Sequence, residues 1–304
     1  MHMDMDRFGR LDAIQVGLVA SLFMELGRDP DRAMLPVLEE YLDRYRPQVR
    51  NFLEGDTADV RVFGDRERAY TRRRLSRKRR ETIYVHATGS PDLRHASCWQ
   101  IDAKFEIERS FAPQRRHLSG IGWSIAPTSD PDDIRDQFLR ATRGGRYLHG
   151  TAGYGIVLPI DVGAMQRCGV QSTALASRFA GFEMLDALWV SQDATDGIKC
   201  VNWLTAVDDE LLDRIGGRDA VRGRFSAAIV CHDLPHGLVV QAGKNPVLGD
   251  VNRVDELSHY REVAAQLRPI YAKVTGVRGL NDYDCDRDYT SAWRNRFFEG
   301  ARWP

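Results

Sequence analysis

The stretch Trp99-Gln-Ile-Asp-Ala-Lys-Phe-Glu-Ile-Glu108 decides the fold class of this 304-residue chain. Apolar and polar residues alternate in it without a break. Trp99, Ile101, Ala103, Phe105 and Ile107 fall on one side, and Gln100, Asp102, Lys104, Glu106 and Glu108 fall on the other. A period of two is typical of an antiparallel strand with one face on a core and one in solvent. We therefore predict a half-buried antiparallel strand, with 119–126 as its neighbour.

Strands and helices are predicted on both sides of this stretch. Residues 13–26 indicate a buried strand, and Asp29-Pro30-Asp31 begins a helix that runs to about Arg46. Asp130 before Pro131 is typical of a helix N-cap. Residues 225–231 and 238–241 indicate a hairpin that turns at 234–237. These elements favour an α+β fold, with an antiparallel or mixed sheet and flanking helices. No Ser/Gly/Pro linker divides the chain, so we predict one compact domain over 1–304.

The charges balance only as a sum. The chain has 43 Lys+Arg, 43 Asp+Glu and 43% hydrophobic residues, a globular composition with zero net charge. Between Arg66 and Arg80, however, nine basic residues stand against one acid, a local charge of +8. We predict a charged loop or mobile excursion over 54–80. Its arginines could bind nucleic acid or an acidic partner, but Tyr70 is the one aromatic residue of the run, which gives base stacking little support.

The location of the protein follows from its apolar runs. The longest, Val16–Met24, is interrupted by Gly17 and Ser21 and is shorter than the ~20 residues that span a bilayer. The residues before it carry acids, which is the wrong charge for a signal peptide. We expect a cytoplasmic protein without membrane contact. The five cysteines are widely and irregularly spaced, so neither a disulfide framework nor a zinc ribbon is expected.

One motif suggests catalysis. Pro91-Asp92 precedes Asp102-Ala103-Lys104, and a Pro-Asp followed by Asp/Glu-x-Lys resembles the signature of restriction-endonuclease-like nucleases. In those enzymes two carboxylates bind Mg²⁺ and a lysine positions the attacking water. The alternative is that Asp102 and Lys104 are charges on a solvated strand face, since alternation produces the same pattern by chance.

Other candidate sites are weaker. Asp282, Asp284, Asp286 and Asp288 have the spacing of a calcium loop, but Arg287 stands where glycine is expected and Trp293 where glutamate is expected. No glycine-rich nucleotide loop and no GxSxG motif is present. We therefore expect no metal, no cofactor and no catalytic residue.

Five segments of the second half share a more specific pattern. They are HGTAGYGIVLP at 149–159, ASRFAGFEM at 176–184, IKCVNWLTAVDDELLDRIGG at 198–217, HGLVVQAGKNPVLGDVNRVDELSHYREVAAQLRPI at 236–270 and SAWRNRFF at 291–298. Asn202-Trp203-Leu204, Gln241-Ala242-Gly243 and Leu248–Asn252 are their most specific parts. Together these segments resemble the type VI secretion immunity proteins, formerly a domain of unknown function, over roughly 145–300.

The resemblance implies a cytoplasmic protein without catalysis. Such a protein binds and neutralises a cognate secreted antibacterial effector by covering its active site or substrate groove. Effectors linked with the family are often nucleases of the restriction-endonuclease-like type. The resemblance implies structural roles, such as core anchor or turn former, for Tyr154, Asn202, Trp203, Gln241, Gly249, Asp250, Asn252, Tyr260 and Trp293.

The partner's chemistry suggests a contact surface. A nuclease groove is cationic, so acidic residues should contact it, and we predict that Asp282, Asp284, Asp286 and Asp288 do so. A Mg²⁺-dependent nuclease that uses Asp92, Asp102 and Lys104 stays the alternative function. The balance of charge does not favour nucleic acid as the partner, and a homodimer is left open.

Overall fold

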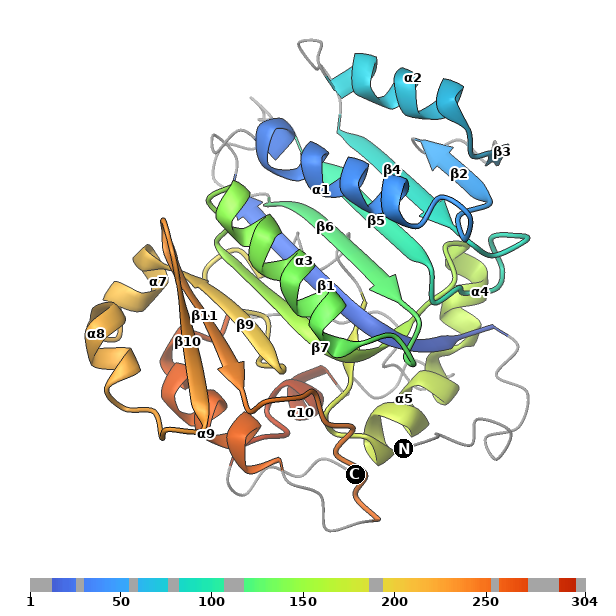
Figure 1. The fold of residues 1–304 in the computed structure, drawn as a ribbon. Coiled ribbons are helices and arrows are strands. Elements are labelled where there is room, and N and C mark those ends of the chain that lie inside the picture. The colour runs from blue at the N-terminus through green and yellow to red at the C-terminus, as the bar shows by residue number, and fades with distance from the viewer. Residues whose placement is uncertain are drawn as a thin grey trace, which may run out of the picture.

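The computed structural model describes residues 13–25, 30–54, 60–75, 82–106, 118–185, 194–252, 257–272 and 290–298. Within them, eleven strands form one sheet in the order β10-β11-β9-β7-β1-β6-β5-β4-β2-β3, with β8 beside β7 (Figure 1). The strands are β1 (Gln15–Glu25), β2 (Asn51–Glu54), β3 (Arg61–Val62), β4 (Ile83–Thr88), β5 (Gln100–Phe105), β6 (Leu118–Ile125), β7 (His149–Val157), β8 (Glu183–Met184), β9 (Leu204–Asp208), β10 (Ile229–Leu234) and β11 (Gly237–Ala242).

The pairing confirms the predicted fold class. All neighbouring strands are antiparallel except β7 and β8, which are parallel, so the sheet is mixed. Strand β1 lies at the centre, where Leu22 is opposite Ile121 of β6 on one side and Gly150 of β7 on the other. Its interior residues are all buried, as expected for a strand with covered faces.

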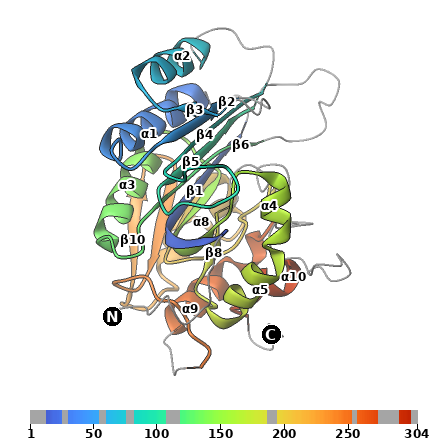
Figure 2. The same ribbon diagram turned by 90° about the vertical axis from the view of Figure 1, so that its right-hand side faces the viewer.

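Helices lie on both sides of the sheet. Figure 2 shows α1 and α3 on one side and α4 and α5 on the other. The helices are α1 (Pro30–Arg44), α2 (Asp65–Leu75), α3 (Pro131–Gly144), α4 (Val162–Arg167), α5 (Gly169–Arg178), α7 (Asp209–Asp213), α8 (Gly217–Arg222), α9 (Ser258–Leu267), the 3-10 turn η2 (Arg268–Ile270) and α10 (Thr290–Arg294). No helix in the described ranges is long and apolar enough to cross a membrane.

Local chemistry explains where α1 and α3 form. In α3 the Asp130 carboxylate accepts a hydrogen bond from the backbone N–H of Asp132, and Pro131 occupies the first turn, so the predicted cap is confirmed. Leu38 and Leu42 of α1 are buried in the core. The Tyr41 hydroxyl beside them donates to the backbone oxygen of Ser124 at 2.8 Å, which fixes α1 on β6.

The prediction of a loop or excursion over 54–80 is wrong for the residues described there. Strand β3 and helix α2 lie within this segment. The helix has Asp65 and Glu67 in its first turn, where they favour the helix dipole, and it is held on α1 by ion pairs. The absence of apolar periodicity therefore did not exclude a helix here, because acidic residues of α1 stabilise the basic helix α2.

The prediction of a half-buried strand over 99–108 is only half right. Strand β5 is antiparallel to β4 and β6, as predicted. Its polar face, however, is as buried as its apolar face, and Lys104 is only 1% exposed. The polar residues of β5 are therefore internal groups, which must find partners inside the protein.

Candidate functional site

Asp92 forms a local turn. Its carboxylate accepts hydrogen bonds from the backbone N–H groups of Arg94 at 2.8 Å and His95 at 3.1 Å. The His95 ring lies 2.8 Å away, and its hydrogen bond is the main cause that lowers the pKa of Asp92. The side chain is about half exposed. Asp92 thus stabilises the bend that follows β4.

Asp102 and Lys104 each have a different partner. Asp102 lies 2.7 Å from His86 Nδ1 and accepts a hydrogen bond from the Gln100 amide at 2.8 Å. Lys104 Nζ lies 2.8 Å from Glu106 Oε2, and both side chains are 1% exposed. The described residues contain no group of three His, Cys, Asp or Glu side chains that could hold a metal ion.

These contacts correct the solvated-face interpretation of the motif and give the nuclease alternative no support. The two charged groups of β5 are not in solvent, and a lysine that neutralises a buried carboxylate is not placed to position a water molecule. His86 was missed as a partner because the sequence does not show that β4 is the neighbour of β5. Gln100 and Glu106 are two residues from Asp102 and Lys104 on the same strand face, so their closeness could be predicted, but the burial that makes them partners could not.

A second buried charge cluster lies around β8. Glu183 Oε1 is 2.8 Å from Lys199 Nζ, and Glu183 Oε2 accepts from the Thr151 hydroxyl at 3.1 Å and the Cys200 thiol at 3.0 Å. Lys199 also donates to the backbone oxygen of Met184 at 2.9 Å. Burial works to raise the pKa of the Glu183 carboxyl, but the Lys199 ammonium and the hydrogen bonds outweigh it and lower that pKa. Glu183 and Lys199 are therefore an ionised pair.

His149 lies in the same interior. Its ring stacks on Phe23 at 4.5 Å between centroids, and its Nε2 donates to the backbone oxygen of Ala194 at 3.1 Å. Burial lowers its pKa to about 3, so the imidazole is neutral at physiological pH.

The cluster contains residue types that are common in active sites, but a substrate has no access to them. Its carboxylate, ammonium, thiol and imidazole groups all lie in the interior, on side chains at most 2% exposed. A substrate could not reach them without unfolding of the core. We therefore interpret the cluster as an internal support of β7, β8 and the chain before β9.

The residues matched by the family resemblance meet near this support. Trp203 is fully buried, and its indole N–H donates to the backbone oxygen of Gly243 at 3.1 Å. The Gln241 amide donates to the same oxygen at 3.0 Å. Asn202 accepts from the backbone N–H of Trp203 at 2.6 Å, and its amide reaches the backbone oxygen of Tyr154 at 3.5 Å. These bonds join β9, β11 and β7.

The remaining matched residues form a turn and two anchors. Gly249 has φ +65°, and a Cβ there would lie 2.8 Å from the backbone nitrogen of Gly181. Asp250 accepts from the backbone N–H of Asn252 at 3.0 Å, which closes the turn. The Tyr260 hydroxyl accepts from the backbone N–H of Val247 at 3.2 Å. Trp293 is fully buried, with Lys199 5.5 Å from its ring centroid.

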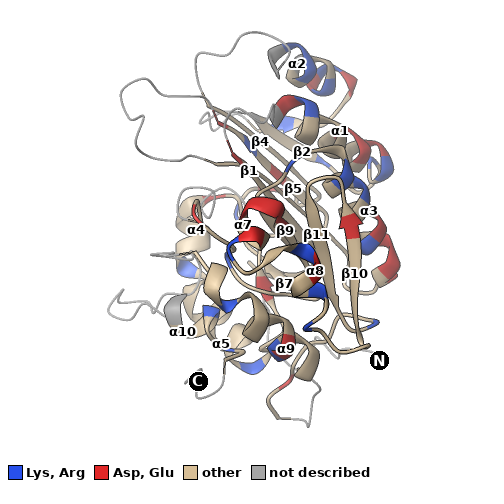
Figure 3. Ribbon diagram, turned by 90° about the vertical axis from the view of Figure 1, so that its left-hand side faces the viewer, with Lys and Arg blue, Asp and Glu red and all other residues tan. Residues whose placement is uncertain are grey.

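The predicted partner-binding residues Asp282, Asp284, Asp286 and Asp288 lie outside the described residues. Among the described residues, acids gather around α7, beside basic positions of α8 (Figure 3). Asp208 is paired with Arg146 at 3.0 Å, Asp209 with Arg218 at 2.5 Å and Glu210 with Arg214 at 3.3 Å. Asp209 and Glu210 are thus each paired with an arginine, and Asp208 is a buried acid.

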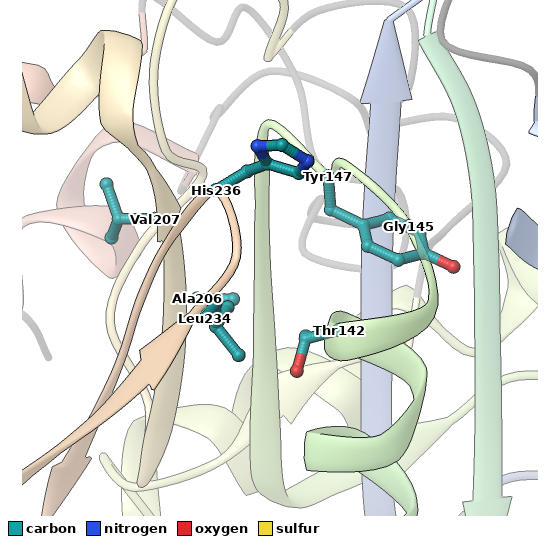
Figure 4. Close-up of a pocket in the computed structure, with 7 residues that line it drawn as sticks. All are labelled: Thr142, Gly145, Tyr147, Ala206, Val207, Leu234 and His236. Carbon is teal, nitrogen blue, oxygen red and sulfur yellow. The ribbon is translucent and has the colours of Figure 1, made fainter.

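A crevice beside α7 is too small for a substrate. Figure 4 shows its lining, which comes from the end of α3, the start of β7, β9 and the β10–β11 turn: Thr142, Gly145, Tyr147, Ala206, Val207, Leu234 and His236. The space that it encloses is about 10 Å³, far below the ~300–1,000 Å³ of small-molecule sites. It is better interpreted as a surface depression.

Another charged surface is formed by ion pairs that join α1 to α2 and α3. Arg68 of α2 binds the carboxylate of Asp43 with both of its terminal nitrogens, one at 2.7 Å, and Arg72 binds Glu39 at 2.6 Å. Arg140 of α3 binds Glu40 at 2.6 Å. Two arginines of the basic run are therefore paired with acids of α1. A signal for this pairing was present in the sequence, because Glu39 and Asp43 have the same i, i+4 spacing as Arg68 and Arg72.

Comparisons with known proteins agree with this picture. A family model described as type VI immunity for VRR-NUC, TsiV, matches residues 52–297. The solved structure described as Pseudomonas aeruginosa T6SS protein PA0821 is similar at a TM-score of 0.80 and 19% identity. That similarity covers 94% of this chain and 83% of that one, and it shows the fold. No sequence among the curated proteins matches the chain.

Proposed function

The chain belongs to the family of type VI immunity proteins for VRR-NUC, and on this premise we propose that it neutralises a cognate VRR-NUC effector by binding to it, without catalysis of its own. The observation that carries the proposal is the family match, which extends over residues 52–297 and so from β2 to α10. The burial of both charged clusters supports it, since neither offers a reactive group to a substrate.

The proposed mode of neutralisation is occlusion. A nuclease binds a polyanion through Lys and Arg side chains, so its substrate groove is cationic. A protein that covers the active site or the groove excludes nucleic acid, so the immunity protein and the substrate compete for the effector. Acidic residues of the immunity protein would face the groove, and we propose Asp282, Asp284, Asp286 and Asp288 for this role.

The remaining partner and location proposals follow from this function. A nuclease that attacks DNA does so in the cytoplasm, so we propose that the chain acts there. We propose that it acts as one domain with the effector as its partner. We propose no nucleic-acid partner, since Arg68 and Arg72 of α2 are bound to carboxylates of α1. A homodimer would be compatible with this account only if it left the effector-binding surface open.

Co-expression tests the proposal. A cognate VRR-NUC effector should co-purify with this chain as a stable complex, and added chain should stop the effector's cleavage of DNA in proportion to the amount added. The rival function is tested with the chain alone and Mg²⁺. DNA cleavage that disappears in Asp102→Ala would refute our proposal and establish a nuclease.

A further inference from the structure

Ion pairs attach helix α2 to the region of α1. They include Arg68–Asp43 and Arg72–Glu39, and Arg46, after the end of α1, binds Asp65 at 2.9 Å. In Figures 1 and 2 the helix lies beyond α1, at the end of the molecule where the edge strands β2 and β3 also lie. Thr71 is its one buried residue among those whose side chains are described.

These ion pairs are weak because water reaches them. The side chains of the Arg68–Asp43 pair are 28% and 55% exposed, and those of the Arg46–Asp65 pair are 56% and 81% exposed. Each exposed pair changes an equilibrium by only about two- to fivefold and is screened by salt. Among the α2 side chains that the structure describes, no apolar one is buried, so we expect α2 to separate from α1 at a lower cost than the rest of the fold.

The helix covers carboxylates of the type that a nuclease groove would bind. Glu39 and Asp43 are occupied by α2 guanidinium groups, and Glu40 lies next to them on α1. A nucleic-acid groove presents Arg and Lys side chains to phosphate, and guanidinium binds carboxylate with the same fork geometry. Arg68 and Arg72 therefore occupy this surface with the chemical groups that the groove of the effector also offers.

We propose that Glu39 and Asp43 of α1 form a contact surface for the cationic groove of the effector, and that α2 is a displaceable cover over it. In the free protein the cover neutralises the two carboxylates. On binding, Arg or Lys side chains of the groove replace Arg68 and Arg72. This inference rests on the proposed function, and it names a surface for it within the described residues.

Nucleic acid is the less favoured occupant of this region. Arg68 and Arg72 would have to leave their carboxylates to reach phosphate, and the sequence between Arg66 and Arg80 contains a single aromatic residue for stacking. Tight binding of DNA by the free chain, lost in Arg68→Gln/Arg72→Gln, would overturn the proposal in favour of that occupant.

The attachment can be tested on the free, full-length chain. Hydrogen exchange of the α2 amides should quicken between low and high salt, while exchange in β1 and β7 stays unchanged. Arg68→Gln/Arg72→Gln should give fast exchange in α2 at low salt. The control is Arg66→Gln/Arg143→Gln, which removes two exposed arginines without an ion pair in the described structure and should leave α2 protected. Protection of α2 that is independent of salt and of both changes would overturn the proposal.

Affinity for the effector tests the surface. If only molecules with α2 displaced can bind the effector, the affinity is reduced by the fraction of molecules in that state. Arg68→Gln/Arg72→Gln removes both ion pairs that keep α2 on α1, so it should tighten binding by about 4- to 25-fold. Glu39→Gln/Asp43→Asn breaks the same two pairs from the other side and should weaken binding. The control Asp213→Asn/Asp219→Asn removes two exposed acids of α7 and α8 and should change it less than twofold.

Opposite effects of the two double variants are the required result. A helix that merely braces the fold would give the same effect from either side, and equal changes would overturn the proposal. Circular dichroism and thermal unfolding should show all four variants folded, because every altered side chain is at least partly exposed. If the unaltered chain does not bind the effector, the proposed function fails, and the exchange experiment still decides whether α2 is a cover.

Discussion

Replacement of Lys199 by Met should destabilise the protein strongly. Lys199 is 2% exposed, lies 2.8 Å from Glu183 and donates to the backbone oxygen of Met184. Methionine fills a similar volume but leaves the buried carboxylate without a cation. Glu183 keeps hydrogen bonds from Thr151, Cys200 and the backbone N–H of Met184, so its charge is only partly compensated.

The magnitude follows from burial. Removal of one partner of a buried ion pair costs about 3–5 kcal/mol, because the remaining charge is desolvated and unpaired. Addition of Glu183→Gln removes that charge, so the double variant should be more stable than Lys199→Met by about 1–3 kcal/mol. Urea unfolding of the single and double variants at pH 7.5 measures both values.

The pH dependence has a definite sign. In the unaltered protein the pKa of Glu183 is lowered. The carboxylate therefore stabilises the fold at a pH above its ordinary pKa, and this stabilisation is lost as the pH falls through the lowered pKa. In Lys199→Met, burial without a cation should raise that pKa, and the variant should gain stability from this group as the pH falls toward it. The difference between the two proteins should therefore shrink from pH 7.5 to pH 5. A cost below 1 kcal/mol, or a difference that does not change with pH, would refute an ionised buried pair.

Four other changes have defined outcomes. The pKa of His149 is about 3 in the folded protein, so this residue takes up a proton in the unfolded chain first as the pH falls below about 6.5. Acid should therefore remove about 3–5 kcal/mol of stability by pH 3. In His149→Leu, pH-dependent unfolding measurements should lack this loss of stability. Gly249→Ala places a Cβ at φ +65° and 2.8 Å from a backbone nitrogen, and should cost at least about 1–3 kcal/mol in urea unfolding. Lys104→Met should lower the melting temperature, yet the folded fraction should still inhibit the effector, since Lys104 is an internal partner of Glu106. Charge reversal of Asp282, Asp284, Asp286 and Asp288 should slow association with the effector and make it less sensitive to salt, measured by stopped flow; unchanged association would remove these residues from the interface.

Local signals predicted most elements of the fold. The Asp130-Pro131 start of α3, the apolar β1 and the β10–β11 hairpin all follow from residues that are close together in the chain. The alternation in β5 also predicted the antiparallel strand, and its predicted neighbour, residues 119–126, is confirmed as β6. It did not predict burial of the polar face, because alternation shows that two faces differ and does not show what covers each of them.

The partners of the charged residues depend on tertiary structure. Lys104 and Glu106 are close in the sequence, but the sequence does not show that both are buried, and Arg68 and Arg72 of α2 find their partners on another helix. The relevant partners of Arg68 and Arg72 lie about 25–33 residues earlier in the chain. Their matching i, i+4 spacing is a usable signal, but only after both segments are recognised as helices.

The central claim is that this chain inhibits a VRR-NUC effector by binding to it. The most direct measurement is DNA cleavage by the effector at a fixed concentration while the chain is titrated into the reaction. Our account predicts that activity falls linearly to zero at a fixed stoichiometric ratio, and that Asp92→Ala inhibits as well as the unaltered chain. Full cleavage in the presence of excess folded chain, or cleavage by the chain itself, would contradict the account.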